Sequence, residues 1–128
     1  MILVIGGAYS GKTDFAMHKF SLRETDILDG AECTQEQAYS CRAMKNFQLF
    51  VKRFGTESGA ALAEQLSGRN PDIIIIADEI GSGIIPMEKS DRIWREGTGR
   101  ACCYIAGRSR AVVRMCCGIP TAIKGELP

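Results

Sequence analysis

Residues 6–13 read Gly6-Gly7-Ala8-Tyr9-Ser10-Gly11-Lys12-Thr13, which fits the phosphate-binding pattern G-x-x-x-x-G-K-[ST]. An apolar run at residues 2–5 precedes this motif, and a helical pattern follows it from Lys12. Glycines let the backbone turn so that several N–H groups point into one concavity, at the positive end of the following helix. The sequence therefore predicts a P-loop between a strand and a helix, and the alternative is an ordinary glycine-rich turn.

The loop residues have distinct expected parts in binding a nucleotide triphosphate. The backbone of residues 6–13 surrounds the phosphates, Lys12 reaches the β- and γ-phosphates, and the Thr13 hydroxyl binds Mg²⁺. The nucleotide is ATP or GTP, and the motif does not distinguish between them.

Length and composition predict one globular domain over residues 1–128. Hydrophobic residues make up 45% and charged residues 24% of the chain, as is usual for such a domain. The net charge of +1 gives no reason to expect nucleic acid or a membrane surface as a partner. Met1 leads directly into the first apolar run, and no apolar stretch is long enough to span a bilayer. We therefore expect a cytoplasmic protein.

Strand and helix patterns alternate along the chain. Apolar runs predict strands at residues 2–5, 26–28, 73–77 and 111–117, with a short edge strand at residues 121–124. Helical patterns follow the P-loop, begin again at Thr34, and occupy residues 34–54, 57–66 and the stretch from Pro86 to Ala106. The alternation predicts an α/β P-loop fold of the RecA-like kind: a mostly parallel sheet flanked by helices, with a short antiparallel edge at the C-terminus.

Acidic residues at the ends of predicted strands are the candidate Mg²⁺ ligands. Asp78 and Glu79 follow the strand at residues 73–77, as a Walker B acid does in P-loop NTPases, and Asp29 follows the stretch at residues 26–28. Because successive residues of a strand face opposite ways, at most one of Asp78 and Glu79 points directly at the metal. The alternative for each acid is a solvated side chain or a helix cap.

The basic residues of the last third offer one further catalytic part. An arginine there could stabilise the transferring phosphate as an arginine finger does; the candidates are Arg92, Arg95, Arg100, Arg108, Arg110 and Arg114. The alternative is that they are solvated or paired with acids. The only histidine, His18, lies on the helix after the P-loop, where surface or packing residues are usual.

Several stretches together point to a family. The opening reads Met1-Ile2-Leu3-Val4-x-Gly6-Gly7-Ala8-x-Ser10-Gly11-Lys12, and residues 79–86 read Glu79-Ile80-Gly81-Ser82-Gly83-Ile84-Ile85-Pro86. The second stretch resembles the Asn-Glu-Val-Gly-x-Gly-Ile-Val-Pro signature of the adenosylcobinamide kinase/adenosylcobinamide-phosphate guanylyltransferase family, the CobU-type enzymes of cobalamin biosynthesis. The opening, the spacing to Gly99-Arg100 and the closing Gly118-Ile119-Pro120-x-x-Ile123-Lys124 are also similar to this family.

The resemblance implies an activity and a set of site residues. It implies nucleotide-dependent phosphorylation of the adenosylcobinamide hydroxyl, followed by GMP transfer through a histidine–GMP intermediate, often in a homotrimer. Residues 6–13 carry over as phosphate binders, and Lys12, Glu79 and Arg100 are the catalytic candidates. Thr13 with Asp29 or Glu79 is the candidate Mg²⁺ site. We therefore expect a homo-oligomer, with a trimer implied by the resemblance.

The chain departs from the family between Phe20 and Asp26. There the family has a strand and a helix that carry the guanylyl-accepting histidine, and this chain has no histidine besides His18. The leading prediction is therefore a kinase for adenosylcobinamide or a related alcohol that lacks guanylyltransferase activity. The alternatives are a degenerate nucleotide-binding subunit with a regulatory or assembly role, and a general P-loop NTPase.

Overall fold

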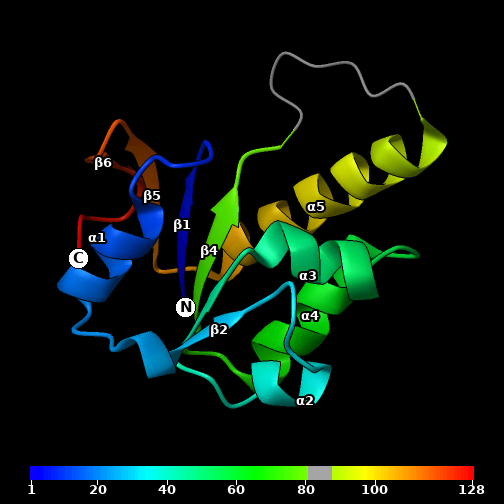
Figure 1. Ribbon diagram of the computed structural model, residues 1–128, viewed down its shortest axis with the longest axis horizontal. Coiled ribbons are helices and arrows are strands. Elements are labelled where there is room, and N and C mark those ends of the chain that lie inside the picture. The colour runs from blue at the N-terminus through cyan, green and yellow to red at the C-terminus, as the bar shows by residue number, and fades with distance from the viewer. Residues whose placement is uncertain (81–87) are drawn as a thin grey trace.

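The computed structural model describes residues 1–80 and 88–128, and in this part of the chain one sheet organises the fold (Figure 1). Its strands lie in the order β2-β3-β4-β1-β5-β6. Their bounds are β1 Ile2–Gly6, β2 Ile27–Asp29, β3 Ala43–Lys45, β4 Ile74–Asp78, β5 Ala111–Cys116 and β6 Ile119–Lys124. All neighbouring strands are parallel except β5 and β6. The predicted α/β fold, with its antiparallel C-terminal edge, is confirmed.

Helices cover both faces of this sheet. Their bounds are α1 Lys12–Lys19, α2 Gln35–Ala38, α3 Phe47–Phe54, α4 Gly59–Arg69 and α5 Lys89–Arg108, and a 3-10 turn, η1, spans Glu24–Asp26. Figure 1 shows α1 on one side of the sheet and α3, α4 and α5 on the other. Within the described residues, no helix combines the length and the apolar character needed to cross a membrane.

The isoleucines of β4 form the centre of two apolar layers. Ile74 and Ile76 pack in the cluster that contains Ala16 of α1. Ile75 packs in the opposite cluster, with buried residues of α3, α4 and α5 that include Phe47, Leu66 and Ile105. A continuous apolar strand is expected where both faces of a parallel sheet are covered. The sequence predicted this burial correctly.

The single helix predicted for residues 34–54 is wrong. The chain instead forms α2, then β3, then α3. Thr34 begins α2 with the expected capping box, in which its Oγ1 accepts from the Gln37 N–H and Gln37 Oε1 accepts from the Thr34 N–H. Met44, however, is buried in β3, which pairs with both β2 and β4. A strand of three residues is too short for its period to be distinguished from a helical one.

Two glycine positions explain details of the packing. Helix α5 continues through Gly97, and a side chain at Gly59 would collide with the Gly97 carbonyl oxygen, so the first turn of α4 lies directly against α5. At the other end of the fold, Cys117 and Gly118 have φ values of 51° and 79°. Positive φ at both central residues forms a tight two-residue hairpin. Strand β5 therefore ends at Cys116, and β6 begins two residues before the predicted edge strand.

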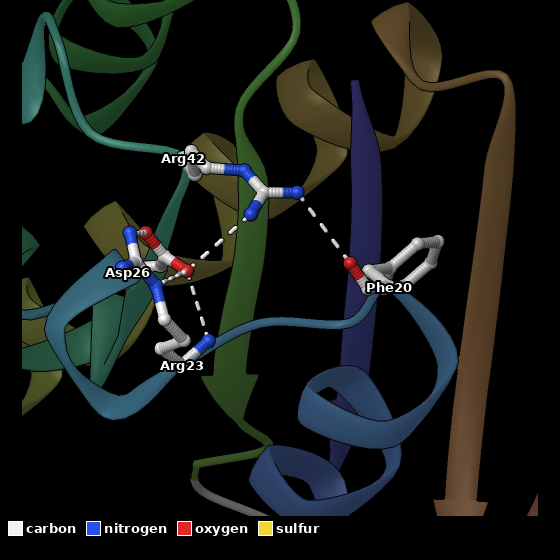
Figure 2. A network of polar contacts seen from close by, with 4 residues as sticks. All are labelled: Phe20, Arg23, Asp26 and Arg42. Atoms are coloured by element: carbon white, nitrogen blue, oxygen red, sulfur yellow. Dashed lines mark hydrogen bonds and ion pairs between the residues drawn. The ribbon is translucent and has the colours of Figure 1, made fainter.

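A polar network fixes the short connection between α1 and β2 (Figure 2). Asp26 accepts hydrogen bonds from the Arg23 backbone N–H and side chain, and it forms a second ion pair with Arg42 at 3.3 Å. Arg42 also donates to the Phe20 carbonyl oxygen. Hydrogen bonding to Arg23, more than the charges nearby, lowers the pKa of Asp26. These side chains thus hold together the short connection between residues 20 and 26.

Candidate nucleotide site

The P-loop has the strand–loop–helix setting that the motif predicts. The loop leaves β1 at Gly6 and enters α1 through Gly11, whose φ of 89° is in the left-handed region that glycine adopts without strain. A Cβ at Gly6 would lie 2.5 Å from the Met115 carbonyl oxygen, so β5 lies directly against the loop. The Gly118 N–H donates to the Ser10 carbonyl oxygen at 3.1 Å. The loop is therefore held from the side of β5 and β6.

Lys12 is the charged residue of the P-loop, and its side chain is buried. Its side chain is only 6% exposed, and its Nζ lies 2.7 Å from Oδ1 of Asp78. The same Nζ donates to the Gly7 carbonyl oxygen at 2.6 Å and lies 3.4 Å from the Ser10 hydroxyl. A buried ammonium needs such partners because burial without them costs several kcal/mol. The amine thus lies at the mouth of the loop, against the end of β4.

Asp78 and Glu79 face opposite sides of the sheet, as the strand alternation predicts. Asp78 continues the face of Ile74 and Ile76, on which α1 lies, and it reaches Lys12. Glu79 instead pairs with Arg114 of β5, with Nε–Oε1 at 3.0 Å and Nη2–Oε2 at 3.1 Å. Both residues lie beside the loop, since the Glu79 N–H donates to the Gly6 carbonyl oxygen at 2.8 Å. Of the two carboxylates, however, only that of Asp78 pairs with the P-loop lysine, whereas that of Glu79 points to Arg114.

The P-loop opens into a cavity of about 550 Å³ at the carboxyl edge of the sheet. Its lining consists of P-loop and α1 residues together with residues at the ends of two strands, β3 and β4: Ala8, Tyr9, Ser10, Gly11, Lys12, Thr13, Asp14, Lys45, Asn46, Ile76 and Asp78. Thr13 and Asp78 offer a hydroxyl and a carboxylate oxygen to this cavity. Oxygen ligands of this kind, together with nucleotide phosphates, are what Mg²⁺ usually takes in proteins. The residues present fit a magnesium–nucleotide complex.

Asp29 does not line this cavity. Its Oδ1 accepts from Asn46 Nδ2 at 3.0 Å and from the Ala31 N–H at 2.9 Å. Burial alone would raise the pKa of the Asp29 carboxyl. The hydrogen bonds from Asn46 and Ala31 and the charges of Lys45 and Arg53 together outweigh burial, so the pKa lies below its usual value. Asp29 thus reaches the cavity only through Asn46, which it holds.

Arg100 and His18 lie away from the cavity. Arg100 is exposed on α5, where it pairs with Glu96 at 2.8 Å, and α5 covers the face of the sheet opposite to α1. His18 is exposed in the last turn of α1 and is absent from the cavity lining. In the predicted signature, Glu79 and Ile80 are described, whereas residues 81–86 lie outside the described residues.

Three residues near the site were missed by sequence reasoning. Lys45 and Asn46 line the cavity, and the buried Gln48 accepts the Asp78 N–H at its Oε1 while its carbonyl oxygen accepts from Trp94 Nε1. All three belong to residues 34–54, for which the sequence predicts one long helix. Had the short strand β3 been recognised, the carboxyl-end rule would have predicted Lys45 and Asn46 as site residues.

Fold and loop together define the class: an α/β protein with a P-loop at the carboxyl edge of a mostly parallel sheet. The family described as cobinamide kinase / cobinamide phosphate guanyltransferase matches residues 35–123, which is more than half of the chain. The protein belongs to this family of enzymes, whose substrates are nucleotide triphosphates and cobinamides. No curated protein matches the chain. Because the family match begins after residue 34, the case for residues 6–13 depends on their motif and geometry.

Proposed function

We propose that the protein is a Mg²⁺- and nucleotide-dependent kinase that phosphorylates adenosylcobinamide or a related alcohol in cobalamin biosynthesis. The observation that carries the proposal is the ion pair between the buried Lys12 and the partly exposed Asp78 at the mouth of the P-loop cavity. Phosphoryl transfer depends mainly on positioning and on charge stabilisation. A loop of N–H groups, a lysine, a hydroxyl and a carboxylate all face this one cavity.

Lys12 and Asp78 exchange partners when the nucleotide arrives. The ammonium of Lys12 leaves Asp78 and donates to the phosphate oxygens, while the backbone N–H groups of residues 6–13 hold the remaining phosphate charge. Thr13 and the released Asp78 carboxylate would hold Mg²⁺, and a bound Mg²⁺ would supply charge neutralisation for the phosphates. In the absence of nucleotide, Asp78 keeps the buried lysine paired.

The other predicted site residues receive narrower parts in this proposal. Glu79 sits at the start of the family-like signature and is oriented by Arg114, so we assign it to the acceptor side rather than to the metal. Arg100 lies on the face opposite to its own P-loop, so a catalytic part for it requires a second copy of the chain. We accordingly propose a homo-oligomer, with a trimer implied by the family resemblance.

We also propose that the chain is not a guanylyltransferase. In the family, that reaction proceeds through a histidine that attacks the α-phosphorus and carries GMP. His18 follows Lys12 by six residues, so at 1.5 Å per residue its backbone lies roughly 9 Å further along the helix axis. A nucleophile must come within about 3–3.5 Å of the reacting atom. His18, exposed in the last turn of α1, does not meet that condition.

A single set of incubations tests the kinase proposal and its alternatives. Purified protein is incubated with labelled ATP or GTP, Mg²⁺ and adenosylcobinamide, beside Lys12→Ala and a Lys19→Ala control whose lysine is exposed on α1. We expect a phosphorylated cobinamide from the wild type and the control, and none from Lys12→Ala. Nucleotide binding without turnover would favour the degenerate subunit, and turnover without the acceptor would favour a general NTPase. A covalent GMP adduct by mass spectrometry would overturn the guanylyltransferase part.

A further inference from the structure

We propose that Lys45 is a second phosphate-binding cation of this cavity and that it contacts the γ-phosphate of the bound nucleotide. The inference deepens the proposed function, because it rests on nucleotide binding at residues 6–13. Lys45 is the last residue of β3, on the strand beside the one that ends in Asp78. It is one of two lysines that line the cavity.

Strand alternation sets the direction of the Lys45 side chain. Ala43 of the same strand packs in the cluster below α1, and Met44 packs in the cluster below α3 and α4. Lys45 therefore shares the face of Ala43, which is also the face of Asp78 and Lys12. A P-loop lysine contacts the β- and γ-phosphates, so Lys12 indicates where these phosphates lie. Lys45 lies on the strand beyond Asp78. The γ-phosphate is therefore the part of the nucleotide nearest to Lys45.

The charge of the cavity also requires this lysine. Its titratable lining groups besides Tyr9 are Lys12, Lys45, Asp14 and Asp78, so the two lysines balance the two carboxylates. Without Lys45 the carboxylates would outnumber the lysine, which disfavours an anion such as a nucleotide triphosphate. Lys12 is already paired with Asp78. Among the described residues Lys45 has no carboxylate within ion-pair distance; the charge of Lys45 acts on Asp29, its neighbour on β2, only from further away.

The backbone that carries Lys45 is held in place by the end of β2. The Gly30 N–H donates to the Lys45 carbonyl oxygen at 2.8 Å, and Asn46, with a left-handed φ of 56°, donates from Nδ2 to Asp29. A Cβ at Gly30 would lie only 2.6 Å from the Asn46 carbonyl oxygen. The lysine therefore extends from a fixed corner, and a fixed donor stabilises developing charge better than a mobile one.

Nucleotide titrations test the contact directly. The wild type, Lys45→Met, Lys45→Arg and the control Lys19→Met are titrated by calorimetry, in Mg²⁺, with the diphosphate and with the β,γ-imido triphosphate. A lost charge-assisted hydrogen bond is worth about 1.5–3 kcal/mol. We therefore expect Lys45→Met to weaken triphosphate binding by about tenfold or more and diphosphate binding by less than about twofold, with Lys45→Arg retaining most of the affinity and Lys19→Met resembling the wild type.

The outcomes separate this inference from the proposed function. If the wild type binds neither nucleotide, the proposed function fails and the inference with it. If the wild type binds and Lys45→Met binds equally well, only the inference is overturned. Equal losses for diphosphate and triphosphate would overturn the γ-phosphate contact. Thermal melting checks that each variant is folded, and Lys45→Gln replaces Lys45→Met if the latter does not fold.

Discussion

The two faces of the sheet differ sharply at its carboxyl edge. On the α1 face, Lys12, Asp78 and Lys45 surround a cavity, and the lysine of the ion pair is 6% exposed. On the opposite face, Glu79 pairs with Arg114, whose side chain is 59% exposed. The carboxylates belong to successive residues of one chain segment, so residue type does not distinguish them. Strand alternation decides which carboxylate faces the P-loop lysine and which one pairs with Arg114.

The two ion pairs also differ in how much free energy is lost when one partner is removed. The pair on the α1 face has lost most of its water on the lysine side, so removing either partner leaves a charge that is poorly solvated. The two acids are about equally exposed, Asp78 at 30% and Glu79 at 26%, so the cations make the difference: Arg114 is 59% exposed and stays largely in water. A pair with one solvated partner is expected to contribute little, close to the value of at most about 1 kcal/mol for exposed pairs. A substitution in the pair on the α1 face should therefore lower stability and activity more than one in the pair on the opposite face.

The largest expected effect comes from exchanging each acid for its amide. Asp78→Asn removes the carboxylate that faces Thr13 and Lys12, so Mg²⁺-dependent turnover should fall by about 100-fold, a size typical of losing one preorganised charge-stabilising group. Glu79→Gln should leave nucleotide affinity within about threefold of the wild type, because its partner is Arg114.

Steady-state kinetics across a range of Mg²⁺ concentrations measures both variants. The comparison of the two faces fails if Glu79→Gln loses Mg²⁺-dependent turnover and Asp78→Asn keeps it. Asp29→Asn belongs in the same series, since Asp29 was a predicted ligand and reaches the cavity only through Asn46. We expect it to retain Mg²⁺ dependence.

A smaller effect is expected at Gly30, which packs against Asn46 in the wall of the cavity. Gly30→Ala places a methyl group 2.6 Å from the Asn46 carbonyl oxygen and 3.0 Å from Phe50 Cβ. Crowding of this kind in a packed interior usually costs about 1–3 kcal/mol. Urea unfolding should show that loss, and nucleotide affinity should fall with it because Lys45 and Asn46 shift.

Gly68→Ala is the matched control for that substitution. Gly68 lies in α4, and a Cβ there meets nothing within 4 Å. Alanine is favoured over glycine in a helix, so the free energy of unfolding should rise by about 0.5–1 kcal/mol. If Gly30→Ala is as stable as this control, β2 does not pack closely against the start of α3.

Sequence reasoning found the fold where its signals were long or chemically specific. The P-loop motif and the isoleucine run of β4 lie where they were predicted, and the antiparallel C-terminal edge exists, with its turn and the start of β6 earlier than predicted. It failed at β3, because three residues carry no readable period and Met44 fits the helical spacing of its neighbours equally well.

That one error concealed the part of the cavity wall formed by Lys45 and Asn46. Lys45 and Asn46 are site residues only because β3 ends beside β4, a fact of sheet order that one sequence does not contain. Asp78 and Glu79 were both found, but choosing between them requires the direction of the strand's side chains. The position of Arg100 likewise depends on which face α5 covers.

The smallest expected effect is a pH dependence at the rim of the same cavity. Burial, the largest influence, would raise the pKa of Asp29, but the hydrogen bonds from Asn46 and Ala31 together with the charges of Lys45 and Arg53 bring it below its usual value. A carboxyl whose pKa is lower in the folded than in the unfolded state stabilises the fold above its unfolded pKa, which is about 3.9, and loses that contribution as the pH falls through the folded value. Asp29→Asn should therefore unfold more easily than the wild type at neutral pH, by about 1 kcal/mol for the weakened hydrogen bonds. The difference should shrink as the pH falls below about 4.

Urea titrations between pH 7 and pH 3 measure this difference in unfolding free energy, with Asp72→Asn, at an exposed position before β4, as the control. A difference that stays constant over this range would mean that the Asp29 charge does not hold Asn46 in place, and the corner beneath Lys45 would then depend on Gly30 alone.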